Sequence, residues 1–248
     1  MMTALTIERR KSKKAWILLL VAVALVGLNA ANGINNYLSN VDTFAAQNVT
    51  WQAVWGQAAL LWGALFFPFL ITMRAASLTR MEHEQGNWRR MASYGAAVSK
   101  TYRGKLGLMC GFVLFCEAVF LAVVLASCLI LGFSLTPGDI GTMFGWTLLG
   151  ALGGVTIAAI QLLVGIIVRS FASTIVIGLG ASILSLAITV VAPALGAIYP
   201  YALVVTGLQA RTLTSPNIVE LAMFLVWNAV LIFVAVIVGR LVLRKKEY

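Results

Sequence analysis

The sequence is short of the residues on which soluble domains and metal sites depend. Charged residues make up only 10% of its 248 positions, against about 25% in soluble domains. His83 is its single histidine, and its three cysteines form no Cys-x-x-Cys pair, so we expect neither a metal site nor a disulfide framework. The one Gly-Lys pair, Gly104-Lys105, is followed by Leu106, whereas a P-loop needs Ser or Thr there. The chain is therefore not expected to be an enzyme with its own nucleotide site.

Hydrophobic residues, by contrast, make up 61% of the chain. They gather in six runs, and a run of about 20 apolar residues crosses the hydrocarbon core of a bilayer. No connection between the runs is long enough for a soluble domain. We therefore predict an all-α membrane protein, a single transmembrane domain over residues 1–248 with six transmembrane helices. The predicted spans are 15–31, 54–73, 106–133, 140–168, 171–195 and 218–242, with a kink expected at Pro68.

The basic residues between the runs predict the topology. Of the 18 Lys and Arg residues, only Arg211 falls in a connection that we assign to the outside. The others lie before the first span, between Arg74 and Lys105, at Arg169, or from Arg240 onward. Because Lys and Arg resist translocation, both termini are predicted to be cytoplasmic. The formal charge of +10 thus reports topology, and no nucleic-acid partner is expected.

The two long outer connections differ in character. Residues 29–50 are polar and nearly uncharged, which predicts a loop. Within 196–217, the run from Tyr199 to Val205 is too apolar for water and too short to cross, so it favours a shallow re-entrant or interfacial helix. Small-residue motifs that allow close helix packing, within one subunit rather than between subunits, are Gly107-x-x-x-Gly111, Gly141-x-x-x-Gly145 and Gly150-x-x-x-Gly154.

The cytoplasmic segment after the second span is the most motif-like part of the chain. Thr79-x-x-Glu82 has the spacing of a capping box, which predicts that a helix starts here. An amphipathic helix over residues 79–94 would lie on lipid or dock into a groove of a soluble partner. The acidic residues Glu82 and Glu84 disfavour anionic lipid, which favours a protein partner. A solvated connector is the alternative.

The run Glu84-Gln85-Gly86-Asn87-Trp88, with Arg103-Gly104-Lys105 opening the third span, resembles the permease subunits of type 2 ABC exporters. The similar branch is that of lantibiotic-immunity and bacitracin-resistance transporters, although Trp88 stands where Phe is more usual. The resemblance implies a multi-pass protein of the bacterial plasma membrane, surrounded by lipids. It also implies two protein partners, a soluble ABC ATPase that binds ATP and Mg²⁺ and a second permease subunit, identical or different. Residues 79–94 would be the coupling helix, and five residues would transmit its motion: Glu82, Glu84, Gly86, Trp88 and Arg89.

Glu117 is the one ionisable residue deep within a predicted span. At 1.5 Å per residue, it lies about 18 Å from Lys105, near the middle of the bilayer, where an ionisable group costs several kcal/mol unless it is neutralised, paired or wet. Gln161 in the fourth span and Asn228 in the sixth are candidate partners. Glu117 thus either lines a substrate path or subunit interface, or is a protonated acid that joins two helices.

The leading hypothesis is an ATP-driven exporter permease for an amphipathic peptide antibiotic, a drug or a lipid. A secondary transporter is the alternative, but no inverted repeat relates residues 1–130 to 131–248. A non-transporting membrane anchor of a signalling complex is also compatible with the sequence. An intramembrane hydrolase is disfavoured, since His83 lies outside the spans and no serine–histidine pair lies within them.

The topology is tested by single-cysteine labelling of intact cells with a membrane-impermeant thiol reagent. Cysteines at Asp42, Asp139 and Arg211 should react, and cysteines at Lys13, Glu84 and Tyr248 should react only after permeabilisation, because the basic residues hold their loops inside. Labelling at residue 84 but not at residue 42 would reverse the assignment.

Overall fold

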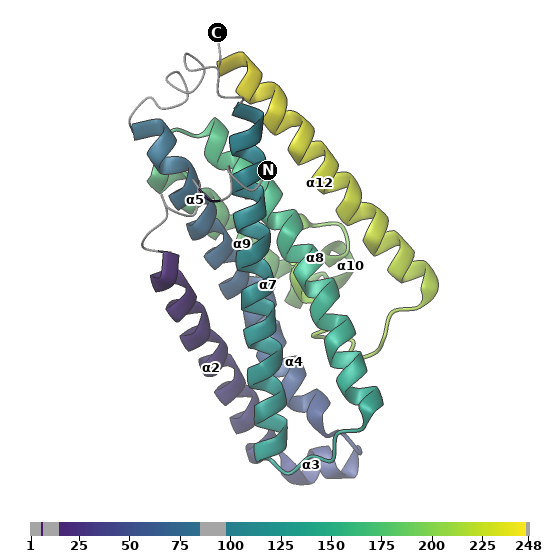
Figure 1. The fold of residues 1–248 in the computed structure, drawn as a ribbon. Helices are drawn as coiled ribbons and strands as arrows, with labels where there is room; N and C mark the ends of the chain where they lie inside the picture. Colours follow the sequence, from purple (N-terminus) through teal and green to yellow (C-terminus); the bar gives the residue numbers. More distant parts are fainter. Residues whose placement is uncertain (1–5, 7–14, 85–97, 247–248) are drawn as a thin grey trace.

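The computed structural model describes residues 6, 15–84 and 98–246 (Figure 1). Within these ranges the secondary structure is helical. Six of the described helical segments are long and apolar enough to cross a membrane: Trp16–Ser39, Trp51–His83, Thr101–Ile130, Pro137–Ile167, Phe171–Val191 and Ile218–Leu243. The predicted all-α fold with six membrane-spanning helices is therefore confirmed.

The helices run lengthwise beside one another, and α8 lies among α5, α7, α11 and α12 (Figure 1). The last turns of α5 and α12 lie at one end of the bundle, and α3 lies at the other (Figure 1). In chain order the elements are α2 (Ala15–Ser39), α3 (Val41–Ala46), α4 (Trp51–Leu61), the π turn η1 (Trp62–Phe66), α5 (Phe67–Glu84), α7 (Val98–Ile130), α8 (Pro137–Ile167), α9 (Phe171–Val191), α10 (Pro193–Gly196), η2 (Pro200–Ala202), α11 (Leu203–Gly207) and α12 (Ile218–Lys246).

The first membrane helix is longer than predicted. α2 continues to Ser39 and α3 follows it, so most of the loop predicted over residues 29–50 is helical. The asparagine polarity that suggested a loop is satisfied within the helix, since Asn29 Nδ2 donates to the Leu25 carbonyl at 2.7 Å. Gly33 also lets α2 approach α4 closely, because a Cβ there would lie 2.6 Å from the Val54 oxygen. Packing against α4 therefore outweighs the polar composition of this segment.

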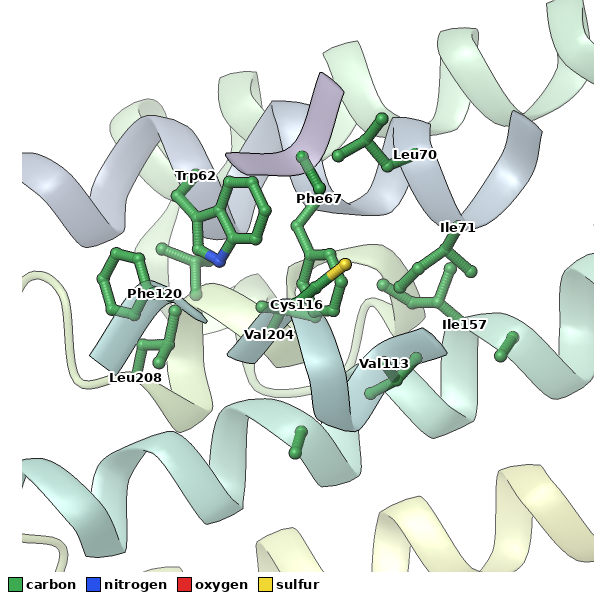
Figure 2. Packing of buried hydrophobic residues seen from close by; sticks show 14 of the residues in the cluster. Trp62, Phe67, Leu70, Ile71, Val113, Cys116, Phe120, Ile157, Val204 and Leu208 are labelled. Atoms are coloured by element: carbon green, nitrogen blue, oxygen red, sulfur yellow. The ribbon is translucent and has the colours of Figure 1, made fainter. Parts of the chain in front are cut away.

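The second membrane helix contains the irregularity expected near Pro68, but as a π turn just before the proline. The Phe67 N–H donates to the Trp62 carbonyl, five residues back, which accommodates a proline that cannot donate a hydrogen bond of its own. Trp62 stacks on Phe67 and on Phe120 of α7, with ring centroids 5.0 and 6.0 Å apart. Figure 2 shows these rings within the buried hydrophobic cluster, together with Cys116 and Leu208.

The helix predicted to start at Thr79 does not start there. α5 continues through Thr79 to Glu84, and the Thr79 hydroxyl donates to the Ala75 carbonyl at 3.1 Å within the same helix. The capping-box prediction is wrong because this turn packs in the interior. A Cβ at Gly165 of α8 would lie 2.6 Å from the Thr79 oxygen.

The apolar segment between α9 and α12 is embedded in the bundle. It forms α10, η2 and α11, and the residues from Tyr201 to Val205 are buried. Polar groups of the surrounding helices meet its backbone: Trp55 Nε1 donates to the Leu208 carbonyl at 2.8 Å, and the Ser185 hydroxyl donates to the Tyr201 carbonyl at 2.9 Å. The segment packs on η1, part-way along the second membrane helix. Of the two predicted forms, re-entrant and interfacial, this packing favours the re-entrant one.

The glycine motifs divide into two groups. Gly150, Gly153 and Gly154 face neighbours inside the subunit, and a Cβ at Gly153 would lie 2.6 Å from the Leu203 carbonyl. Gly111, Gly141 and Gly145 have no described atom within 4 Å of a Cβ placed on them. The Gly150-x-x-x-Gly154 motif therefore packs within the described subunit as predicted, whereas Gly141-x-x-x-Gly145 does not.

Gly153→Ala should destabilise the protein by roughly 1–3 kcal/mol, since the added methyl group meets backbone atoms of α11 that have no room to move. Gly145→Ala, in the same helix but facing open space, should be neutral or stabilising, because alanine is the better helix former by about 1 kcal/mol. The apparent unfolding temperature of the detergent-solubilised protein measures both. Equal temperatures for the two variants would contradict the close contact.

Candidate functional site

A buried ion pair joins the two helices on either side of residues 85–97. Lys105 Nζ of α7 lies 3.1 Å from Glu82 Oε1 of α5, and the side chains are 1% and 0% exposed. Lys105 Nζ also donates to the Leu78 carbonyl at 2.8 Å. Removing either charge would leave its partner charged and buried, so the pair holds the end of α5 against α7.

The same end of α5 is attached to two further helices. His83 Nε2 lies 2.8 Å from the Gly165 carbonyl of α8, and a carbonyl can only accept, so this nitrogen carries the proton. The Arg80 guanidinium lies over the Phe171 ring at the start of α9, 5.1 Å from its centroid. α5 therefore reaches residue 84 as part of a rigid assembly with α7, α8 and α9.

This geometry decides where some of the predicted coupling residues lie. Glu82 is buried and paired with Lys105, so it does not offer its side chain to a partner protein. Glu84 ends α5. Gly86, Trp88 and Arg89 lie outside the described residues, as does most of the predicted 79–94 helix, and their roles stay predictions. The pairing of Glu82 with Lys105 was missed because 23 positions separate them; opposite charges at matching ends of adjacent spans were the available signal.

Glu117 is buried in α7, and no described residue forms a hydrogen bond with it. Its side chain is 1% exposed, and neither carboxyl oxygen has a partner among the described residues. The indole N–H of Trp62 lies within electrostatic reach of the carboxyl, but its geometry falls short of a hydrogen bond. On the α8 side, Glu117 Oε1 would lie 3.5 Å from a Cβ placed on Gly150.

The two partners predicted for Glu117 bond elsewhere, so that prediction is wrong. Gln161 accepts from the Tyr201 hydroxyl and donates from Nε2 to the Thr174 carbonyl at 3.0 Å. Asn228 Oδ1 accepts from the Thr156 hydroxyl at 2.5 Å. Both are interhelical polar contacts, but Gln161 lies about three turns along α8 from Gly150, the residue level with Glu117.

Glu117 lines a groove of about 300 Å³ between α7 and α8. Thr147 is the other polar residue in its lining, and its hydroxyl donates to the Met143 carbonyl at 2.8 Å. The remaining lining residues are leucine, alanine and phenylalanine. The groove thus joins an apolar wall to a single buried carboxyl.

The family model described as ABC-2 family transporter protein matches residues 4–185, more than half of the chain. The chain belongs to this family. The match covers the helices that hold the Glu82–Lys105 pair and Glu117. No curated protein matches the chain. Membership of the family makes the chain a multi-pass permease, the transmembrane subunit of an ABC transporter, and implies an ABC ATPase partner.

Lys105→Met should cost about 3–5 kcal/mol of stability, because it leaves Glu82 buried without its counter-ion. Combining Lys105→Met with Glu82→Leu should recover much of that loss, since an apolar pair of similar volume replaces the ion pair. Arg103→Met, at an exposed position two residues earlier in α7, is the matched control and should stay within about 0.5 kcal/mol. Thermal unfolding in detergent measures all three, and a double variant less stable than Lys105→Met would refute the pairing.

Proposed function

We propose that this ABC-2 permease is the membrane subunit of a bacterial exporter, driven by ATP hydrolysis in its partner, that moves an amphipathic peptide antibiotic, drug or lipid out of the cell or its membrane. The observation that carries the proposal is the buried Glu82–Lys105 pair at the base of the connection between α5 and α7. The resemblance of residues 84–88 and 103–105 to lantibiotic-immunity and bacitracin-resistance permeases favours that branch. An ion-driven transporter and a non-transporting anchor have no comparable support.

The distribution of basic residues supports an orientation with both termini in the cytoplasm. Arg80, Arg103, Lys105 and Arg169 belong to the end of the bundle at which α5 ends, which we name the basic end. Arg211, at the opposite end, donates from Nη1 to the Thr189 and Val190 carbonyls at the end of α9. Its position is thus explained by capping of a helix, where a cation is favourable. The basic end is then cytoplasmic by the positive-inside rule.

Coupling to the ATPase follows from how α5 is held. We assign docking on the ATPase to the segment that continues from α5, with Trp88 as its aromatic anchor and Glu84, Gly86 and Arg89 around it. Glu82 acts from the interior as a positioning residue, through Lys105. Since α5 is fixed to α7 by the ion pair and to α8 by His83, a push on this segment moves these helices together.

A second permease subunit and lipid complete the proposed transporter. α12 leaves most of its surface uncovered, and only 11% of its most apolar window is buried. Large apolar side chains such as Met223, Val226 and Phe233 are exposed on it, which in a membrane face lipid or another subunit. ATP and Mg²⁺ belong to the ATPase partner.

Trp88→Ala should abolish co-purification of the ATPase and stimulated ATP turnover while leaving insertion of the permease unchanged, because an aromatic anchor carries much of a helix-in-groove contact. Trp16→Ala, which removes an exposed aromatic from the start of α2, is the control and should retain both. Glu82→Gln should keep the ATPase bound but lower the stimulated turnover, as expected for a positioning residue. Normal turnover by the Trp88 variant would count against the coupling assignment.

A further inference from the structure

Glu117 and the groove it lines are not explained by packing of the described chain. The carboxyl is 1% exposed and unpartnered among the described residues, and it belongs to the wall of the α7–α8 groove. A buried carboxyl in hydrocarbon is costly unless it gains hydrogen bonds or a counter-charge. Its two oxygens can accept about four hydrogen bonds, and both lie buried in the groove wall with no described donor.

Among the described residues, neither α7 nor α8 has a Lys or Arg at the depth of Glu117. α8 contains no Lys or Arg, and the basic residue of α7 nearest in sequence is Lys105, about 18 Å along the helix and engaged by Glu82. A second copy of the chain would bring the same distribution of charges, with its basic residues at the helix ends. No described Lys or Arg of α7 or α8 therefore supplies a counter-charge for Glu117, and a twin subunit repeats this arrangement, which points to a ligand.

The chemistry of the groove defines that ligand. Its leucine, alanine and phenylalanine lining matches hydrocarbon, and its volume of about 300 Å³ is at the lower end of the range for small-molecule pockets. A carboxylate pairs strongly with an ammonium group through charge-assisted hydrogen bonds. We propose that the α7–α8 groove binds a lipophilic cation, with the ammonium group on Glu117 and the adjoining hydrocarbon chain along α7 and α8.

This site deepens the proposed function, on which it rests, by naming the class of substrate as amphipathic amines. Entry is sideways from the bilayer, because the groove opens on the surface of α7 and α8, where Leu114, Phe144 and Leu148 are exposed. Thr147 lines the same groove, and its oxygen retains lone pairs after its own donation to Met143. An ammonium group has three N–H donors, and the Glu117 carboxyl and the Thr147 hydroxyl provide acceptors for more than one of these donors.

The test uses dicyclohexylcarbodiimide, a lipid-soluble reagent for carboxylic acids, on the full-length permease in phosphatidylcholine nanodiscs. The acid O–H adds across one C=N bond of the reagent and nothing leaves, so the product keeps the mass of both molecules. Mass spectrometry of the peptide containing residue 117 gives the labelling rate. Glu117 should react, and saturating dodecylamine should slow the reaction by about tenfold or more, because only the unoccupied fraction is modified. Neutral N-acetyldodecylamine and anionic dodecyl sulfate should protect little.

Two groove variants supply a matched control for access. Ala122→Trp fills the groove from an exposed lining position and should block both labelling and amine binding. Ala126→Trp adds the same side chain one turn further along α7, at an exposed position outside the lining, and should leave both unchanged. Equal effects of the two tryptophans would overturn the site.

Other outcomes also overturn the proposal. Equal protection by N-acetyldodecylamine would mean that the groove recognises hydrocarbon alone. Labelling of isolated subunits but not of assembled permease would mean that a second copy fills it. Since the labelling needs no ATPase, normal ATPase binding and turnover in the Trp88 variant, together with normal amine protection, would refute the coupling role without affecting the site. Where coupling holds, Glu117→Gln should lower amine export without changing the amount of assembled transporter.

Discussion

The close approach between α8 and the re-entrant segment is the contact on which the rest of the packing depends. Gly150 and Gly153 remove the side chains that would keep Leu208 and Leu203 away from α8. Irregular backbone inside a membrane must find its hydrogen bonds within the protein. Trp55 and Ser185 supply two of them, and the Tyr201 hydroxyl reaches Gln161 of α8. The segment thereby links α4, α8 and α9, and it packs on the π turn from which Trp62 reaches α7.

Two buried acids show how differently one residue type is used in this permease. Glu82 is fully buried but has Lys105 within 3.1 Å, so its desolvation is offset by a counter-ion and it locks two helices together. Glu117 is as deeply buried, yet no described residue donates to it. Stabilisation of the fold accounts for the first acid. The second retains the capacity to bind something that is not part of the chain.

The membrane-spanning helices were predictable because they follow from solvation alone. A run of about 20 apolar residues must be helical in lipid, and six such helices are found. The re-entrant segment was predictable for the same reason, since Tyr199 to Val205 suits neither water nor a full crossing. The ends of the helices were not predictable, because the polarity of residues 29–50 and the capping pattern at Thr79 are local signals. Contacts of Gly33 with α4 and of Gly165 with Thr79 override them.

The sequence by itself thus determined the class of protein, the number of membrane helices and the residues that merit attention, since composition and motif need no knowledge of neighbours. Tertiary structure alone decided which of those residues meet. Gln161 and Asn228 were expected to bond with Glu117, but the rotation of α8 and α12 turns their side chains toward Tyr201 and Thr156. Glu82 pairs with Lys105, 23 positions away, while Glu117 lies in the wall of a groove without a described partner. Side-chain partners depend on how helices are rotated and offset against one another, and that is fixed by packing between segments distant in the sequence.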